Sequence, residues 1–127
     1  MNNNHDQLAR MKQLHNKPMD GMPTFEKDSI IPLKVLILQI IDWHHDRNLI
    51  EGSTDKDQAL KLLQELGELS DSICRGEDIR DDIGDMLVVM LNIMVRNNLT
   101  LKDCLEKAWN DIKDRKGKMI DGIFVKS

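Results

Sequence analysis

Two pairs of acidic residues have the spacing expected of a metal site. Glu65 and Glu68 are three residues apart in one predicted helix, and Asp82 and Asp85 repeat that spacing in the next. A three-residue step is close to one helical turn, so each pair lies on one face of its helix. Both pairs are placed symmetrically about position 75, in a predicted turn. An antiparallel helical hairpin folded there would bring the four carboxylates into one patch.

Such a patch predicts a bound divalent cation, because neighbouring carboxylates repel one another when nothing lies between them. Oxygen ligands suit Mg²⁺, with Mn²⁺ as a substitute. The expected ligands are Glu65, Glu68, Asp82 and Asp85. Two other interpretations stay open. The acids could belong to two solvated helix faces, or to a di-iron bundle, although the nearest approach to its Glu-x-x-His motif is a single Asp42-x-x-His45, outside the patch.

Apolar periodicity predicts four helices that would position these acids. They are expected at residues 32–47, 54–73, 78–96 and 101–116. Thr54 or Asp55 is the predicted N-cap of the second helix, and Thr100 that of the fourth. The inward stripe of the second helix is predicted to be Ala59, Leu62, Leu63, Leu66, Leu69 and Ile73.

Composition supports an all-α fold. The 127 residues include eight Met and no Tyr, and only 3% are aromatic, whereas strands favour aromatic and β-branched residues. We therefore expect a bundle of about four helices with a central antiparallel hairpin. Residues 1–29 are polar and broken by Pro18, Gly21 and Pro23, so we predict an arm with a short helix near 6–15, and a helical catalytic domain over 30–127.

The charge and the cysteines narrow the function classes. A formal net charge of −4 does not suit binding to duplex nucleic acid, which requires a basic surface. No apolar run is long enough to span a membrane, and the N-terminus lacks the pattern of a signal peptide. Cys74 and Cys104 have no metal-ligand spacing and are expected to be reduced thiols. These observations predict a cytoplasmic protein.

The acidic motif resembles that of the MazG-type nucleotide pyrophosphohydrolases, an all-α superfamily that also includes the dimeric dUTPases. The matching segments are Lys61-Leu-Leu-Gln-Glu65-Leu-Gly67-Glu68-Leu and Asp82-Ile-Gly-Asp85-Met-Leu. Trp109-Asn110-Asp-Ile-Lys113-Asp-Arg115-Lys116-Gly-Lys118, and the closing Asp121-Gly-Ile-Phe-Val-Lys126, resemble the family's basic C-terminal segment. The resemblance covers about residues 33–126.

The resemblance implies cleavage of a nucleoside triphosphate between its α and β phosphates, which yields a monophosphate and pyrophosphate. The acids would hold Mg²⁺, and Glu65 or Glu68 would activate the attacking water. Family members are typically dimers or tetramers, so we expect a homodimer or homotetramer. Two positions depart from the family pattern. Asp82 stands where Glu is usual, and Gln64 where many members carry another acid.

Several further residues are candidates for substrate binding. Lys61 could contact a phosphate or simply form an ion pair with Glu65, one turn away. Trp43 could stack on the base or pack in the core. The phosphate-binding candidates of the basic segment, which could equally be a solvated helix end, are Asn110, Lys113, Arg115 and Lys116.

Two other functions remain possible from the sequence. One is a non-catalytic helical module that binds a nucleotide or a protein partner without turnover, as the departure at Asp82 suggests. The other is a phosphohydrolase acting on a different pyrophosphate ester, which would share the metal site and differ in the pocket for the base. The preferred base and sugar do not follow from the sequence.

Overall fold

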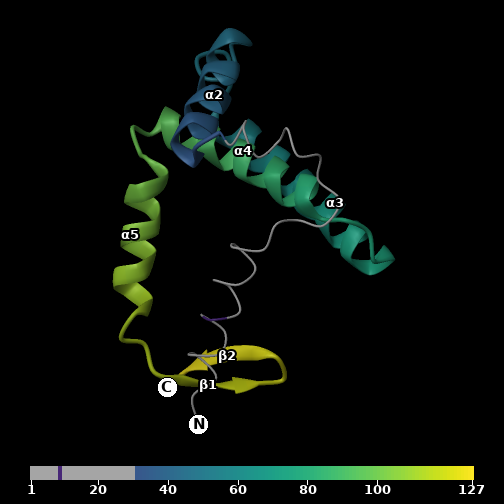
Figure 1. The fold of residues 1–127 in the computed structure, drawn as a ribbon, viewed down its shortest axis with the longest axis vertical. Coiled ribbons are helices and arrows are strands. Elements are labelled where there is room, and N and C mark those ends of the chain that lie inside the picture. The colour runs from purple at the N-terminus through teal and green to yellow at the C-terminus, as the bar shows by residue number, and fades with distance from the viewer. Residues whose placement is uncertain (1–8, 10–30) are drawn as a thin grey trace. The chain divides into compact units, whose positions relative to one another are not determined.

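A computed structural model of the protein describes Ala9 and residues 31–127. Residues 33–127 form one compact unit. Its elements are the helices α2 (Leu33–Asp46), α3 (Asp55–Arg75), α4 (Arg80–Arg96) and α5 (Leu101–Ile112), and the strands β1 (Gly117–Ile120) and β2 (Ile123–Lys126) (Figure 1). The four predicted helices are thus present. Ala9 is helical, and the rest of the predicted arm and of its short helix lies outside the described residues.

Local capping explains where α3 and α5 begin and where α3 ends. Thr54 accepts a hydrogen bond from the backbone N–H of Asp57 (3.1 Å), and Thr100 forms a reciprocal capping box with Asp103. Gly76 ends α3 in a left-handed conformation (φ 68°), which glycine adopts without a steric penalty. Thr54 and Thr100 are the N-caps that the sequence predicts.

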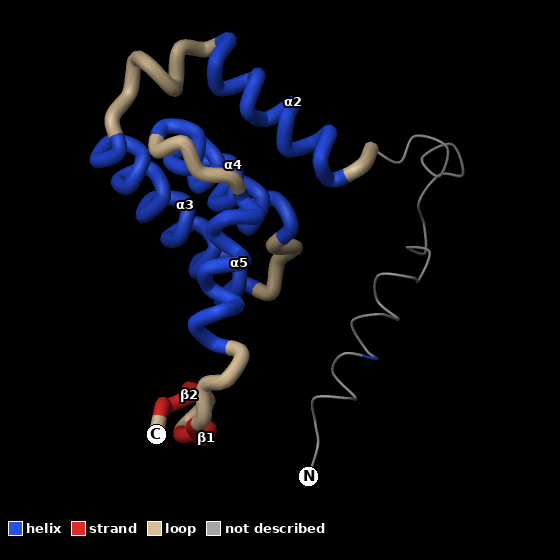
Figure 2. The backbone as a smooth tube through the Cα atoms, turned by 90° about the vertical axis from the view of Figure 1, so that its left-hand side faces the viewer, coloured by secondary structure: helices blue, strands red, loops and turns tan. Residues whose placement is uncertain are grey.

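Helix α3 packs against α4, and α2 packs against α4 as well (Figure 2). On α3, Glu65 is buried and Leu62 and Leu69 are half-buried, and the three follow one another at helical spacing. The predicted stripe was partly wrong, because Leu63, Leu66 and Ile73 are exposed in the single chain. Leu63 and Leu66 are each one position beyond Leu62 and Glu65, about 100° around the helix axis, and Ala59 of the predicted stripe is exposed as well.

Polar contacts join the end of α4 to the start of α3. Arg96 donates to a carboxylate oxygen of Asp55 (3.0 Å) and to the carbonyl of Ile50 in the preceding loop. Asn97 donates to the other oxygen of Asp55 (3.1 Å), and these two donors hold the pKa of Asp55 below its ordinary value. The contacts fix the loop that connects α2 to α3.

The expectation of an all-α chain was wrong for the tail. Strands β1 and β2 form an antiparallel two-stranded sheet in which Ile120 pairs with Ile123. The turn between them is Asp121-Gly122, with φ of 49° and 80°. Two successive positive φ values define a hairpin turn that Asp-Gly favours strongly. The sequence therefore contained a local signal for this hairpin.

Helix α5 and the hairpin bury none of their side chains within residues 33–127. Trp109 remains 60% exposed. None of the described helices is both long enough and apolar enough to cross a membrane.

Candidate functional site

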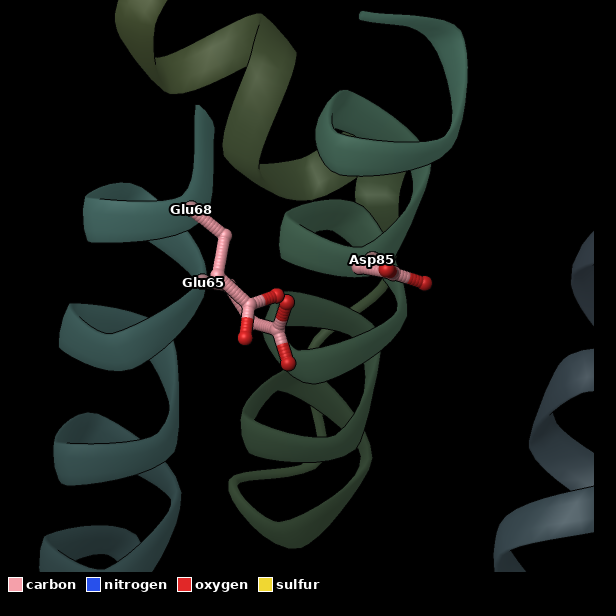
Figure 3. Close-up of side chains that lie close together, drawn as sticks. All are labelled: Glu65, Glu68 and Asp85. Carbon is pink, nitrogen blue, oxygen red and sulfur yellow. The ribbon is translucent and has the colours of Figure 1, made fainter. Parts of the chain in front are cut away.

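Three carboxylates from two helices meet between α3 and α4. Glu65 and Glu68 extend from successive turns of α3, and Asp85 lies on the facing part of α4 (Figure 3). Each offers one oxygen, and these three atoms lie within 4.8 Å of one another. The pairing of Glu65 with Asp85 across the helices is the one expected from their symmetric placement in the sequence.

Glu65 is the buried member of this carboxylate cluster, at 5% exposure. Its Oε1 forms an ion pair with Lys61 Nζ at 2.9 Å. This interaction holds the pKa of Glu65 below its ordinary value. Its Oε2 is buried without a hydrogen-bond partner. A buried carboxylate oxygen without a partner is costly, so this position is suited to a cation. Lys61 thus makes its predicted ion pair, and it is one turn from the cluster.

The other two acids have raised pKa values. The adjacent carboxyl group of Glu65 raises the pKa of Glu68 above its ordinary value. Burial raises the pKa of Asp85, and the charges of Asp81, Glu65 and Asp82 add to this shift. Without a cation, Glu68 and Asp85 therefore take up protons more readily than isolated acids, whereas Glu65 does not. Because a divalent cation would replace those protons, its binding should weaken as the pH falls.

Asp82 lies outside the 4.8 Å cluster, although its charge acts on Asp85 one turn away. Within the described residues, no hydrogen bond or ion pair joins the predicted phosphate-binding residues of α5 and the following loop to the cluster. Their roles stay predictions. The residues concerned are Asn110, Lys113, Arg115 and Lys116.

A cavity of about 380 Å³ opens beside the cluster, between α2 and α4. Its lining residues are Leu36, Gln39, Ile40, Trp43, Asp85 and Val88. Asp85 belongs both to this lining and to the carboxylate cluster. Trp43 is 42% exposed, and the guanidinium of Arg47 lies 4.5 Å from the centre of its ring. In this chain, Trp43 is thus a cavity residue and not a core residue.

A buried polar network next to this cavity was not predicted from the sequence. His44 Nε2 lies 2.8 Å from the carbonyl oxygen of Val88, and the Asn92 amide bonds both to His44 Nδ1 (3.2 Å) and to the Leu49 carbonyl (3.0 Å). Both side chains are almost fully buried. The sequence contained one indication of it, since His44 and Asn92 each follow apolar residues by three and four positions in their helix. A polar side chain on such a face needs a buried partner.

The site thus combines an oxygen-only ligand set, a neighbouring ammonium group and an adjoining apolar cavity. The carboxylate oxygens suit a hard divalent cation, and the apolar cavity suits a planar ring. The carboxylate ligand set and the ammonium group together suit a phosphate.

Comparison with known proteins gives one relative of undescribed activity. The chain is 41% identical over 69 residues to an uncharacterised 18.2 kDa protein encoded in the rep-hol intergenic region of Haemophilus phage HP1 (strain HP1c1). The match covers 53% of this chain and 42% of the phage protein. No family model matches the chain. No solved structure matches it either.

Proposed function

We propose that this chain is a magnesium-dependent nucleoside triphosphate pyrophosphohydrolase that releases a nucleoside monophosphate and pyrophosphate. The observation that carries the proposal is the cluster of Glu65, Glu68 and Asp85, in which a buried oxygen of Glu65 has no partner. The resemblance to the MazG-type enzymes supports it. Free thiols at Cys74 and Cys104 agree with an enzyme of the reducing cytoplasm.

The ligand set fits the proposed metal. Three carboxylates supply oxygen atoms only, which suits Mg²⁺ or Mn²⁺ better than zinc. Glu65, Glu68 and Asp85 would hold the ion, with Asp82 as a fourth ligand or a bridge through water. When bound, Mg²⁺ supplies charge stabilisation to the phosphates and lowers the pKa of a coordinated water.

The chain's own residues would bind and orient the substrate. Lys61 offers an ammonium group at the edge of the cluster, where it can neutralise phosphate charge that the acids would repel. The cavity beside Asp85 would take the base, with the ring of Trp43 as an apolar wall and the amide of Gln39 as a hydrogen-bonding group. Asn110, Lys113 and Arg115 would provide further donors to the phosphates.

We further propose that the active protein is a homodimer or homotetramer built around the central helical hairpin of α3 and α4. Helix α3 carries a second apolar stripe that is exposed in the single chain, and its leucines and isoleucine lie at Leu63, Leu66 and Ile73. The steps of three and seven residues between them are the spacing at which helices pack on one another. A second copy of the chain is the proposed occupant, because the same stripe on both copies can form a symmetric interface.

The products test the proposed reaction. The protein is incubated with Mg²⁺ and a panel of standard and modified nucleoside triphosphates, and the phosphate products are identified. Pyrophosphate and monophosphate in equal amounts are expected, with loss of turnover in EDTA. Orthophosphate as the sole phosphate product would exclude cleavage between the α and β phosphates.

A second function is favoured by one observation. Asp82 lies outside the cluster, so only three carboxylates converge. A chain with a reduced ligand set could bind a nucleotide or a protein partner without turnover. Saturable binding of Mg²⁺ and nucleotide, without product over hours, would select this function.

A further inference from the structure

The buried pair of His44 and Asn92 joins α2 to the helix that carries Asp85. Asp85, Val88 and Asn92 follow one another on α4 at steps of three and four residues, so they lie on one helix face. The imidazole of His44 meets this face at Val88 and Asn92. The cavity is bounded by Asp85 and Val88 on the same face. The pair and the cavity therefore share one contact between two helices.

The partners of the network determine its proton positions. The carbonyls of Val88 and Leu49 can only accept, so His44 Nε2 carries the imidazole proton and the amide nitrogen of Asn92 faces Leu49. His44 Nδ1, which faces the same amide nitrogen, is then the acceptor. The arrangement requires a neutral imidazole in a single tautomer.

The network adjoins the cavity through Trp43. The rings of Trp43 and His44 are in edge contact, with centroids 5.2 Å apart. Val88 both receives the hydrogen bond from His44 and lines the cavity. A shift of the His44 side chain would therefore displace two residues that line the cavity, Trp43 on α2 and Val88 on α4. The carboxylate cluster itself belongs to α3 and α4, which pack together without α2.

We propose that His44 and Asn92 form a latch that positions α2 over α4 and thereby sets the shape of the cavity for the nucleotide base. His44 is a positioning residue, which acts through Trp43 and Val88. The inference rests on the proposed function for the identity of the ligand. The inference predicts that loss of the latch weakens nucleotide binding and leaves the metal site unchanged.

The first experiment tests the latch without reference to activity. Long-range ¹⁵N NMR of the imidazole nitrogens in the full chain distinguishes the two neutral tautomers. The expected spectrum assigns a protonated Nε2 and an unprotonated Nδ1 to His44. A protonated Nδ1 in the neutral imidazole would overturn the proposal, because the bond from Asn92 would then be impossible.

The second experiment compares His44→Leu with His44→Gln. Leucine removes both hydrogen bonds, whereas the glutamine amide can still donate to the Val88 carbonyl. We expect His44→Leu to raise KM for the preferred triphosphate by about tenfold or more, since misplaced binding groups are costly. His44→Gln should recover most of this loss. Affinity for Mg²⁺ alone, measured by calorimetry, should change less than about twofold.

A third measurement separates failure of the latch from failure of the proposed function. In a Trp109→Phe background, the emission of Trp43 reports on the contact between α2 and α4. His44→Leu should shift this emission and His44→Gln should restore it, whether or not the protein turns over nucleotides. Unchanged emission and unchanged KM in His44→Leu would overturn the latch. Absence of any turnover in the wild type, with the expected NMR and emission results, would reject only the proposed reaction.

Discussion

Glu65 occupies a position that packing alone would assign to an apolar residue. It lies between Leu62 and Leu69 on the buried stripe of α3, and only one of its two carboxylate oxygens is paired, by Lys61. Burial of an incompletely paired charge lowers stability. In the proposed enzyme, the ion that the site binds would offset that cost.

The substitution Asp85→Asn should separate this cost from the function of the site. In EDTA the variant should be as stable as the wild type or up to about 1 kcal/mol more stable, because a half-buried charge facing Glu65 is removed. Its melting temperature should rise less on addition of Mg²⁺, since a ligand stabilises in proportion to its affinity. Thermal melts of both proteins with and without Mg²⁺ measure this. A variant that is less stable in EDTA and keeps the full Mg²⁺ shift would identify Asp85 as a structural acid.

The raised pKa of Glu68 predicts a pH-dependent effect of Glu68→Gln. An acid whose pKa is raised in the folded state stabilises that state below its ordinary pKa, and this stabilisation is lost as the pH rises through the raised value. The ordinary value is 4.5. In EDTA, Glu68→Gln should therefore be more stable than the wild type at pH 7, and the difference should shrink as the pH falls toward 4.5. Paired melts across this range test the effect, and a pH-independent difference would contradict it.

At the scale of elements, side-chain caps begin α3 and α5, whereas α4 begins without a side-chain cap hydrogen bond. Helix α3 spans 21 residues, from the cap at Thr54 to the left-handed Gly76. Within it, Gly67 lies between Glu65 and Glu68, and a methyl group there would meet no atom within 4 Å. Glycine inside a helix is unfavourable relative to alanine because its unfolded backbone is freer.

Two glycine-to-alanine substitutions in this helix should have opposite effects. Gly67→Ala should stabilise the protein by up to about 1 kcal/mol, because alanine is the better helix former and the space is open. Gly76→Ala should destabilise it by a similar amount, because the φ of 68° strains any residue with a Cβ atom. Chemical denaturation of both variants measures the signs. A loss of stability in Gly67→Ala would indicate that another chain or segment approaches this part of α3.

At the scale of the molecule, residues 33–127 leave large apolar side chains exposed along α3 and α5. Among the described residues, Val89 and Leu91 are the only hydrophobic side chains that are buried. Leu60 and Leu63 of α3 are 68% and 64% exposed, and Trp109 of α5 is exposed to a similar extent. Soluble monomers rarely leave such extended apolar surfaces open. The exposure agrees with assembly through the second stripe of α3.

Self-association should depend on that stripe. The wild type should sediment as a dimer or tetramer, with a melting temperature that rises with protein concentration. Leu63→Glu should shift it toward monomer, because a charge in a helix–helix interface loses its hydration. Gln64→Glu, at an exposed position of the same helix about 100° around its axis from Leu63, is the control and should leave the assembly unchanged. A Leu63→Glu protein with wild-type sedimentation would place the interface elsewhere.

The sequence by itself determined the helices and the principal contact of the cluster. Apolar periodicity and the caps at Thr54 and Thr100 depend on residues only three or four positions apart, so they can be recognised without a tertiary model. The placement of Glu65 and Asp85 opposite each other followed from equal distances to a short turn. The Asp121-Gly122 turn was equally local, and its hairpin could have been predicted.

Tertiary structure decided which side of each helix faces a partner. The stripes through Leu62 and Leu63 of α3 differ by one residue, and only the position of α4 determines which of them is buried. Asp82 lies outside the cluster for a related reason, since the rotation of α4 about its axis is not encoded in its own spacing. His44 and Asn92 are 48 residues apart, and no local pattern links them. Their pairing arises from the packing of α2 on α4, which supplies partners for both His44 nitrogens and for the Asn92 amide nitrogen, whereas Asn92 Oδ1 is buried without one.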